Sequence, residues 1–267
     1  MIGLWWIETI KLVFRKRWLT VIPAFALIAF INISTLHSYP QLHFNIWDGV
    51  LGVFFSYVYF RFVILLLFVF LVVDSISGDI ASNWVWLTLN RYSNRYQWWT
   101  AKMTSVFTAA FIYTMLGIVT VFLISLLSLP FETSFSRFAT DPSNLFLTLG
   151  TYVIPQGTNP FVLCIEIVLY TAFAISIFAL IPIALSLILR KDYLVPMIPL
   201  AWIFLSQFLL SNPTYFQIDL IPRLMYGAYY YSGQVYPLSL TGSLLYLSVV
   251  GIALWCGGAY ILSRVDF

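Results

Sequence analysis

Two ionisable side chains lie within long apolar runs of this sequence, where a charge is costly unless it has a partner. Arg61 is eleven residues into the run from Val50 to Val73, and Glu166 is five residues into the run from Phe161 to Leu189. If these runs cross a membrane as helices, Arg61 lies roughly 16 Å deep and its charge costs at least about 2.5 kcal/mol. Arg61 then either faces a polar cavity, where it contacts a substrate or Glu166, or it ties helices together or extends to the surface.

The side chains that most enzyme chemistry needs are missing. The sequence has two histidines, His37 and His43, which could bind a metal together with Asp48. However, no cysteine or second carboxylate is suitably spaced to complete a convincing metal site. Neither histidine lies in an apolar run, so an intramembrane serine–histidine pair has no base. The sequence has no Gly-Lys dipeptide, which excludes the phosphate-binding motif GxxxxGK[ST]. We therefore expect no catalytic residue, metal or cofactor in this chain, and any ATP-driven work needs another subunit.

The composition indicates that lipid, not water, surrounds most of the chain. Of 267 residues, 61% are hydrophobic and only 9% are charged, whereas soluble domains carry roughly 25% charged residues. The two cysteines, Cys164 and Cys256, lie inside apolar runs and are expected to act as small core residues. Basic residues are not interleaved with accessible aromatics in the way that nucleic-acid binding requires, so no nucleic-acid partner is expected.

Six apolar runs are candidates for membrane-spanning helices, because about 20 apolar residues cross a bilayer core. Backbone groups in lipid must be paired within the segment, which favours helices over open strands. The sequence therefore predicts an all-α integral membrane protein with one domain, residues 1–267. The six runs, of which the first and fifth are short, are Leu19–Ser34, Val50–Val73, Met103–Leu127, Phe161–Leu189, Leu194–Leu210 and Thr241–Leu262.

The basic residues predict the orientation of these helices. Segments at the cytoplasmic side of a membrane carry an excess of Lys and Arg. With six spans, the segments on the other side hold only Arg137 and Arg223, and both termini are predicted to be cytoplasmic. The ten basic residues on the predicted cytoplasmic side are Lys11, Arg15, Lys16, Arg17, Arg91, Arg95, Lys102, Arg190, Lys191 and Arg264.

The first 18 residues are predicted to form an amphipathic helix at the membrane interface. The basic cluster follows the first apolar residues instead of preceding them, so the segment does not resemble a cleavable signal peptide. The alternative is a frayed start of the first span. The apolar face would carry Ile2, Trp6, Ile10 and Val13, and the polar face Glu8, Lys11 and Arg15.

The segment before the last span, residues 211–240, is rich in tyrosine, glycine and proline. It is apolar enough to enter the outer leaflet as a broken, re-entrant hairpin. Its tyrosines, among them Tyr229 and Tyr230, suit either an aromatic belt or a lining of the substrate path. We therefore group Arg61, Glu166, Tyr229 and Tyr230 as candidate residues of a substrate path.

The longest predicted cytoplasmic segment is residues 74–102, between the second and third spans. It mixes charges and amide side chains with four tryptophans. Such a segment is expected to form short amphipathic helices at the membrane surface, with an aromatic and basic face for a cytoplasmic partner.

The order of these parts resembles the permease subunits of type-2 ABC exporters. In that family an acidic residue and a glycine four residues later open the first cytoplasmic loop, as Asp74 and Gly78 do here. A basic turn and a lysine then precede the third span, as Arg91 to Arg95 and Lys102 do, and the ending Ser263 to Phe267 is similarly basic and then acidic.

The resemblance implies a coupling loop that docks on a cytoplasmic ATP-binding subunit. Two such subunits, which carry ATP and Mg²⁺, and a second permease subunit would complete an assembly in a bacterial cell membrane. That assembly would move an amphipathic or peptide-like substrate out of the cell by alternating access. The expected coupling residues, with the contact centred on 83–95, are Asp74, Gly78, Asn83, Trp84, Trp86, Arg91, Arg95 and Lys102.

Two other functions fit the sequence. A secondary transporter can be built from two inverted three-helix repeats, and six spans allow this arrangement. However, Arg61 and Glu166 are few groups for proton or sodium coupling. A membrane anchor or sensor subunit that transports nothing is the other alternative, and nucleotide-driven flux separates it from an exporter.

Overall fold

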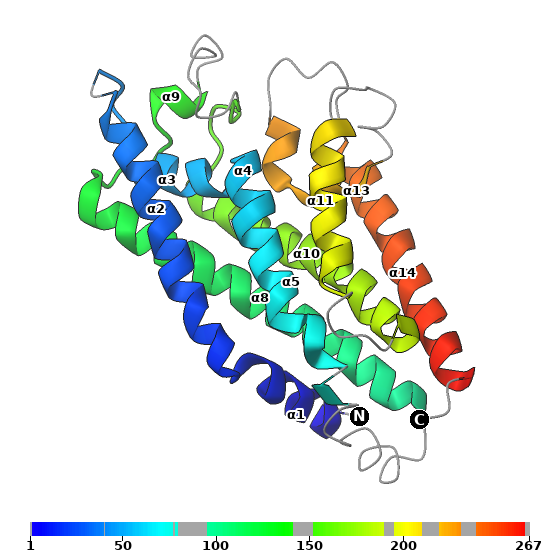
Figure 1. The fold of residues 1–267 in the computed structure, drawn as a ribbon. Helices are drawn as coiled ribbons and strands as arrows, with labels where there is room; N and C mark the ends of the chain where they lie inside the picture. The colour runs from blue at the N-terminus through cyan, green and yellow to red at the C-terminus, as the bar shows by residue number, and fades with distance from the viewer. Residues whose placement is uncertain are drawn as a thin grey trace.

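The computed structural model is a bundle of helices (Figure 1). The part of the chain that it describes contains helices and no β-strand, in agreement with the predicted all-α class. The described residues are 2–39, 41–76, 78–79, 95–140, 152–189, 195–209, 219–230 and 239–264.

Five helical stretches are long and apolar enough to cross a membrane. They are α2 with the preceding turn η1 (Lys16–His37), the α4–η2–α5–η3 stretch (Tyr57–Ser75), α8 (Arg95–Ser128), α10 (Pro160–Leu189) and α14 (Leu240–Arg264). The fifth predicted span, Leu194–Leu210, coincides with α11 (Met197–Leu209), which has 13 residues and is about 20 Å long, shorter than a bilayer core of about 30 Å. A sixth crossing therefore remains a prediction.

The longest helix, α8, has 34 residues and runs diagonally through the bundle (Figure 1). It packs against α1 (Ile2–Val13), α2 (Val21–His37), α3 (Ile46–Phe54), α10 and α14. Tyr113 lies at the centre of this packing, where its ring contacts Phe25 and Phe68 and its hydroxyl donates to the Ile64 carbonyl at 2.9 Å. The core thus forms around α8, and movement of α8 would reach most of the bundle.

The predicted second span, Val50–Val73, begins too early. Residues 50–54 belong to the separate buried helix α3, and the helix that is long enough to cross a membrane starts at Tyr57. Ser56 produces the break, because its extended backbone and its hydroxyl, which accepts from the Tyr59 amide at 3.4 Å, start a new helix.

The N-terminal segment is helical, as predicted, but it has two parts. Helix α1 ends at Val13, the backbone of Arg15 is extended, and the 3₁₀ turn η1 (Lys16–Thr20) then leads into α2. Helix α1 meets α2 at an angle, and it lies at the same end of the bundle as the last turn of α14 (Figure 1). We call this end basal, and we call the opposite end, which holds α3, α9 (Arg137–Thr140) and α13 (Leu220–Leu224), apical.

The predicted loop 74–102 is shorter than the sequence suggested. Helix α8 begins at Arg95, so residues 95–102 form its first two turns and not a surface loop. A run of aromatic and basic residues looks polar in sequence, yet Trp98 and Trp99 are fully buried against the bundle. Four of the expected coupling residues, Asn83, Trp84, Trp86 and Arg91, lie outside the described residues.

The described part of the predicted re-entrant segment contains two short helices. Helix α13 and the 3₁₀ helix η5 (Tyr226–Tyr230) are separated by the extended residue Met225, which is the broken pattern that the sequence indicated. Asp219 caps α13 through its carboxylate, and the same carboxylate accepts from Trp202 and Ser206 of α11. The depth of this segment in a membrane remains a prediction.

Candidate functional sites

A cluster of buried charges joins three elements at the basal end. The ammonium group of Lys102, on α8, lies 2.5 Å from Glu8 Oε2 on α1 and also pairs with Asp79 Oδ2. It donates to the Ser75 carbonyl at 3.1 Å, and Lys11 Nζ lies 2.7 Å from Asp79 Oδ1. We call the four charged residues Glu8, Lys11, Asp79 and Lys102 the ionic junction.

The ionic junction is buried and its charges balance. Glu8, Asp79 and Lys102 are each at most 3% exposed, and two cations face two carboxylates. Partial burial lowers the pKa of Lys11 from its ordinary value, and the hydrogen bond to Asp79 opposes this shift. Removing one of the three fully buried members leaves an uncompensated buried charge, which is strongly destabilising.

A second, more exposed ion pair lies beside the ionic junction. Asp74 accepts from Arg15 Nη1 at 2.6 Å and lies 3.0 Å from Arg17 Nη1. Two of the expected coupling residues, Asp74 and Lys102, therefore contact the N-terminal segment. Gly78 is also at the basal end, and a Cβ added there would meet nothing within 4 Å.

The first two turns of α8 also contact the last turns of α14. Arg95 Nη1 donates to the Leu262 carbonyl at 3.3 Å, and Trp99 Nε1 donates to the Trp255 carbonyl at 3.0 Å. The Trp99 ring lies directly on Gly258, where a Cβ would overlap it. Within the chain, the guanidinium of Arg95 thus pairs with a carbonyl at the end of α14, one of the groups that a helix C-terminus leaves unpaired. The expected contact of Arg95 with a partner subunit stays a prediction.

The charged residue within the second span, Arg61, is only 1% exposed. It lies in the π-helical stretch η2 (Phe60–Leu65), and its guanidinium carbon is 5.0 Å from the centre of the Tyr57 ring. Stretches of π-helix are rare and often occur at functional sites. Arg61 is therefore an internal residue of the bundle and does not extend to the surface.

Arg61 and Glu166 form no ion pair with each other in the described residues. Glu166 is exposed on α10 and accepts a hydrogen bond from the Tyr226 hydroxyl at 2.6 Å. This conformation thus lacks the ion pair between Arg61 and Glu166 that the sequence allowed.

Tyrosines from η5 and α10 form a connected cluster at the apical end. The hydroxyl groups of Tyr170 and Tyr229 are 2.5 Å apart, and those of Tyr226 and Tyr230 are 3.2 Å apart. Tyr170 and Tyr229 both donate to the Arg223 carbonyl. The candidates Glu166, Tyr229 and Tyr230 thus meet in one cluster. Arg61 instead lies against the ring of Tyr57.

A buried carboxyl group fixes the apical loop after α8. Asp48 Oδ1 accepts from the Ser136 hydroxyl at 2.7 Å, and Oδ2 accepts from the Asn45 amide at 2.8 Å. Burial raises the pKa of Asp48 to about 7, despite these hydrogen bonds, and nearby Glu132 adds to the increase.

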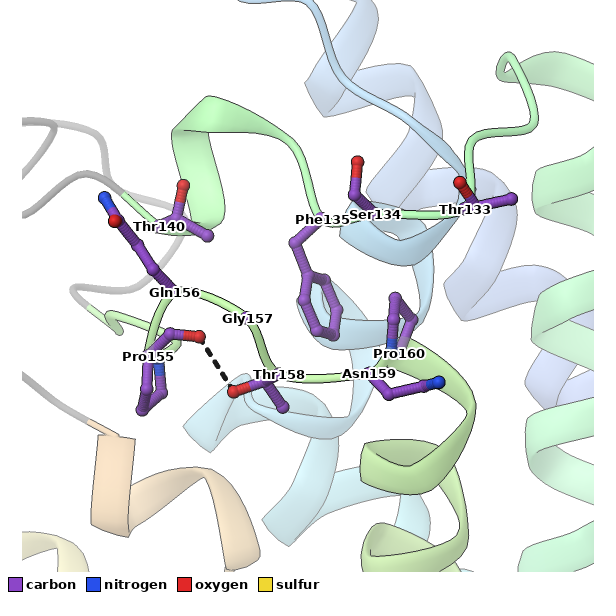
Figure 2. Close-up of a pocket in the computed structure, with 10 residues that line it drawn as sticks. All are labelled: Thr133, Ser134, Phe135, Thr140, Pro155, Gln156, Gly157, Thr158, Asn159 and Pro160. Carbon is purple, nitrogen blue, oxygen red and sulfur yellow. Dashed lines mark hydrogen bonds between the residues drawn. The ribbon is translucent and has the colours of Figure 1, made fainter.

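The same loop borders an uncharged cavity of about 420 Å³ (Figure 2). Gly157 has a φ of +85°, and the Thr158 amide donates to the Pro155 carbonyl, which together make a tight turn in one wall. The lining residues are Thr133, Ser134, Phe135, Thr140, Pro155, Gln156, Gly157, Thr158, Asn159 and Pro160. Within the described residues, no group of three or more His, Cys, Asp or Glu side chains could hold a metal.

The ionic junction was only partly visible in the sequence. Of its four members only Lys102 was a candidate site residue, and Asp74, another candidate, lies in the neighbouring ion pair. Lys11 and Arg15 are four residues apart on one helix face, and their partners Asp79 and Asp74 are five residues apart. That match of charges was the available signal. No family model, curated protein or solved structure matches this chain.

Proposed function

We propose that this chain is the membrane-embedded permease half-subunit of an ATP-driven exporter of the type-2 ABC class. The observation that carries the proposal is the ionic junction, because it links the N-terminal helix, the start of the segment 74–94 and α8 through buried charges. Those are the elements through which an exporter would receive the movement of a cytoplasmic ATP-binding subunit.

The ionic junction suits force transmission, because separating its members has a high cost in free energy. Glu8, Asp79 and Lys102 are too buried for water to replace a lost partner, so α1, the 74–79 turn and α8 are held as one body. Arg95 and Trp99 join α14 to the same end of α8. A push on the segment between Asp79 and Arg95 would therefore move α1, α8 and α14 together as a rigid body.

The proposed assembly contains two copies of this chain, or this chain and a similar permease, with two ATP-binding subunits that carry ATP and Mg²⁺. Because Arg61 and Glu166 are the few ionisable groups in the apolar runs, we propose an amphipathic or peptide-like substrate, and not a small hydrophilic ion. The tyrosine cluster at the apical end, with Glu166, Tyr229 and Tyr230, supplies hydroxyl groups near the proposed exit. We place the assembly in a bacterial cell membrane.

The first test is purification of the tagged chain in mild detergent, with identification of the proteins that co-purify and an ATPase assay. We expect a stoichiometric ATP-binding protein whose ATPase activity appears in the complex. A variant with Lys102→Met should lose this partner or its activity, whereas Arg137→Gln, at the apical end, should keep both. A chain that purifies alone and shows no ATPase under any condition would overturn the proposal.

One observation favours a secondary transporter as the second candidate. Arg61 is 1% exposed within a span and lies in a π-helical stretch, as expected for a group that binds an anion in mid-membrane. For this candidate, uptake into vesicles would follow an ion gradient without ATP, and Arg61→Leu would abolish it while leaving membrane insertion normal. For the exporter, flux would require ATP.

A further inference from the structure

The bend between α1 and α2 presents an unusual combination of apolar and basic side chains. The chain turns at Arg15, where the backbone is extended, and η1 then places Lys16 and Arg17 on the outside of the bend. Trp18 holds this turn in place, because its buried ring packs edge-on against Tyr113 of α8. The positions of Lys16 and Arg17 are therefore set by the core and not by a loose loop.

Large apolar side chains lie exposed on both sides of the bend. Phe14, directly after α1, is 82% exposed, and Leu19, in η1, is 77% exposed. Trp6, Ile7 and Ile10 continue the exposed stripe along α1 at three- and four-residue spacing, whereas the opposite face of α1 is buried against α8. A stripe of this kind at a bend before a span fits the boundary between headgroups and acyl chains.

The charges at the bend do not balance. Arg15 and Arg17 share the single carboxylate of Asp74, and Lys16 is exposed with no ion pair among the residues that the structure describes. Three cations and one carboxylate leave a local charge of +2. An anionic group at the headgroup level would complement this charge, and basic residues at a membrane surface contribute about 1 kcal/mol each to the binding of anionic lipid.

We propose that the bend binds the headgroup of an anionic phospholipid. Lys16 and Arg17 contact the phosphate oxygens, and Phe14 and Leu19 pack against the acyl chains of the same lipid. Arg15 keeps Asp74 paired, at 2.6 Å, when Arg17 turns toward the lipid. This inference rests on the proposed membrane placement, but it does not depend on ATP-driven transport.

The test is to reconstitute the full chain into nanodiscs of phosphatidylcholine with one fifth phosphatidylglycerol. After mild re-extraction, native mass spectrometry counts the phosphatidylglycerol that stays bound. We expect enrichment over the bulk ratio, which falls roughly ten- to thirty-fold in the double variant K16Q/R17Q, as expected for the loss of two surface charges. Arg137→Gln removes one exposed charge at the apical end and should leave the enrichment within two-fold of the unchanged chain.

Three outcomes would overturn the proposal: no enrichment in the unchanged chain, the same enrichment in K16Q/R17Q, or an equal fall in the apical control. Lys16 and Arg17 are exposed, so the double variant should stay folded, and elution as a single monodisperse peak checks this. Co-purification of an ATP-binding protein is measured on the same samples. If the unchanged chain shows no lipid enrichment but co-purifies with an ATP-binding protein, only the lipid proposal is refuted. If it shows lipid enrichment but no ATPase co-purifies, only the exporter proposal is refuted.

Discussion

Lys102 is the residue on which the basal end depends, because one ammonium group serves two carboxylates from different elements. Burying Glu8 and Asp79 would be unfavourable without it, since a buried carboxylate needs a close cation. Lys11 compensates Asp79 only from one side and remains partly exposed. The arrangement is therefore stable as a set and fragile to the removal of its central cation.

Replacing Lys102 with Met should remove about 3–5 kcal/mol of stability, because the buried carboxylates Glu8 and Asp79 then lose the cation that they share. Thermal unfolding in detergent measures the effect as a lower midpoint temperature. Lys16→Gln is the matched control, since Lys16 is exposed and its loss should leave the midpoint unchanged. An unchanged midpoint for Lys102→Met would show that the ionic junction adds nothing to stability.

Asp48 should make the apical end less stable as the pH rises. Its pKa is raised from the ordinary value of 3.8 to about 7, so the folded chain keeps a proton that the unfolded chain has lost. The free energy of unfolding then falls by up to about 4 kcal/mol between about pH 4 and pH 7, and it is constant above pH 7.

Asp48→Asn should remove this part of the pH dependence, because an amide resembles the protonated acid and can still accept from the Asn45 amide. Thermal midpoints of both proteins from pH 4 to pH 8 provide the measurement. Parallel curves would mean that Asp48 does not take up a proton on folding.

At the scale of the elements, the sequence predicted the long helices well and the breaks between them poorly. The runs Phe161–Leu189 and Thr241–Leu262 differ from α10 and α14 by at most two residues at either end. Hydrophobicity alone predicts such helices, because lipid requires a continuous apolar stretch. The break at Ser56 was missed, since one serine capping an amide is a local effect that an apolar average conceals.

The candidate sites show the same limit. Arg61 stood out by its type and was found buried. Contacts such as Lys102 with Glu8, or Arg95 with Leu262, depend on how helices cross, and the charges of these residues do not encode that geometry. Residues 95–102 looked like a loop because they are aromatic and basic, yet Trp98 and Trp99 pack inside.

The contact between α8 and α14 predicts a strong difference between two adjacent glycines. A Cβ on Gly258 would overlap the Trp99 ring, whereas a Cβ on Gly257 would meet nothing within 4 Å. Gly258→Ala should therefore cost about 1–3 kcal/mol through overpacking, and Gly257→Ala should be neutral or slightly stabilising, since alanine favours helices. Thermal midpoints of the two variants test this, and equal midpoints would contradict the close approach of Trp99.

At the scale of the whole molecule, α8 connects the two ends. Its first turns hold the ionic junction and α14, and its last turns pack on α3, next to Asp48 and the apical loop. A tilt of α8 at the basal end would therefore move the wall of the apical end in the opposite direction. The proposed alternating-access mechanism requires such opposite movements at the two ends. The basal contacts of α8 are therefore the place to test coupling.

Lys11→Gln is the variant that separates coupling from folding. It removes the direct contact between α1 and Asp79. Because Lys11 is partly exposed and Lys102 still pairs with Asp79, the fold and the proposed binding of an ATP-binding subunit should persist. For the proposed exporter, transport per ATP hydrolysed in proteoliposomes should fall several-fold, because α1 loses its direct contact with Asp79 and is linked to it only through the Glu8–Lys102 pair. Arg264→Gln is the control, since Arg264 is an exposed basal cation that stacks on Tyr260 outside the ionic junction. If both variants keep the transport-to-hydrolysis ratio of the unchanged chain, the ionic junction is a structural clamp and force reaches the bundle through another contact.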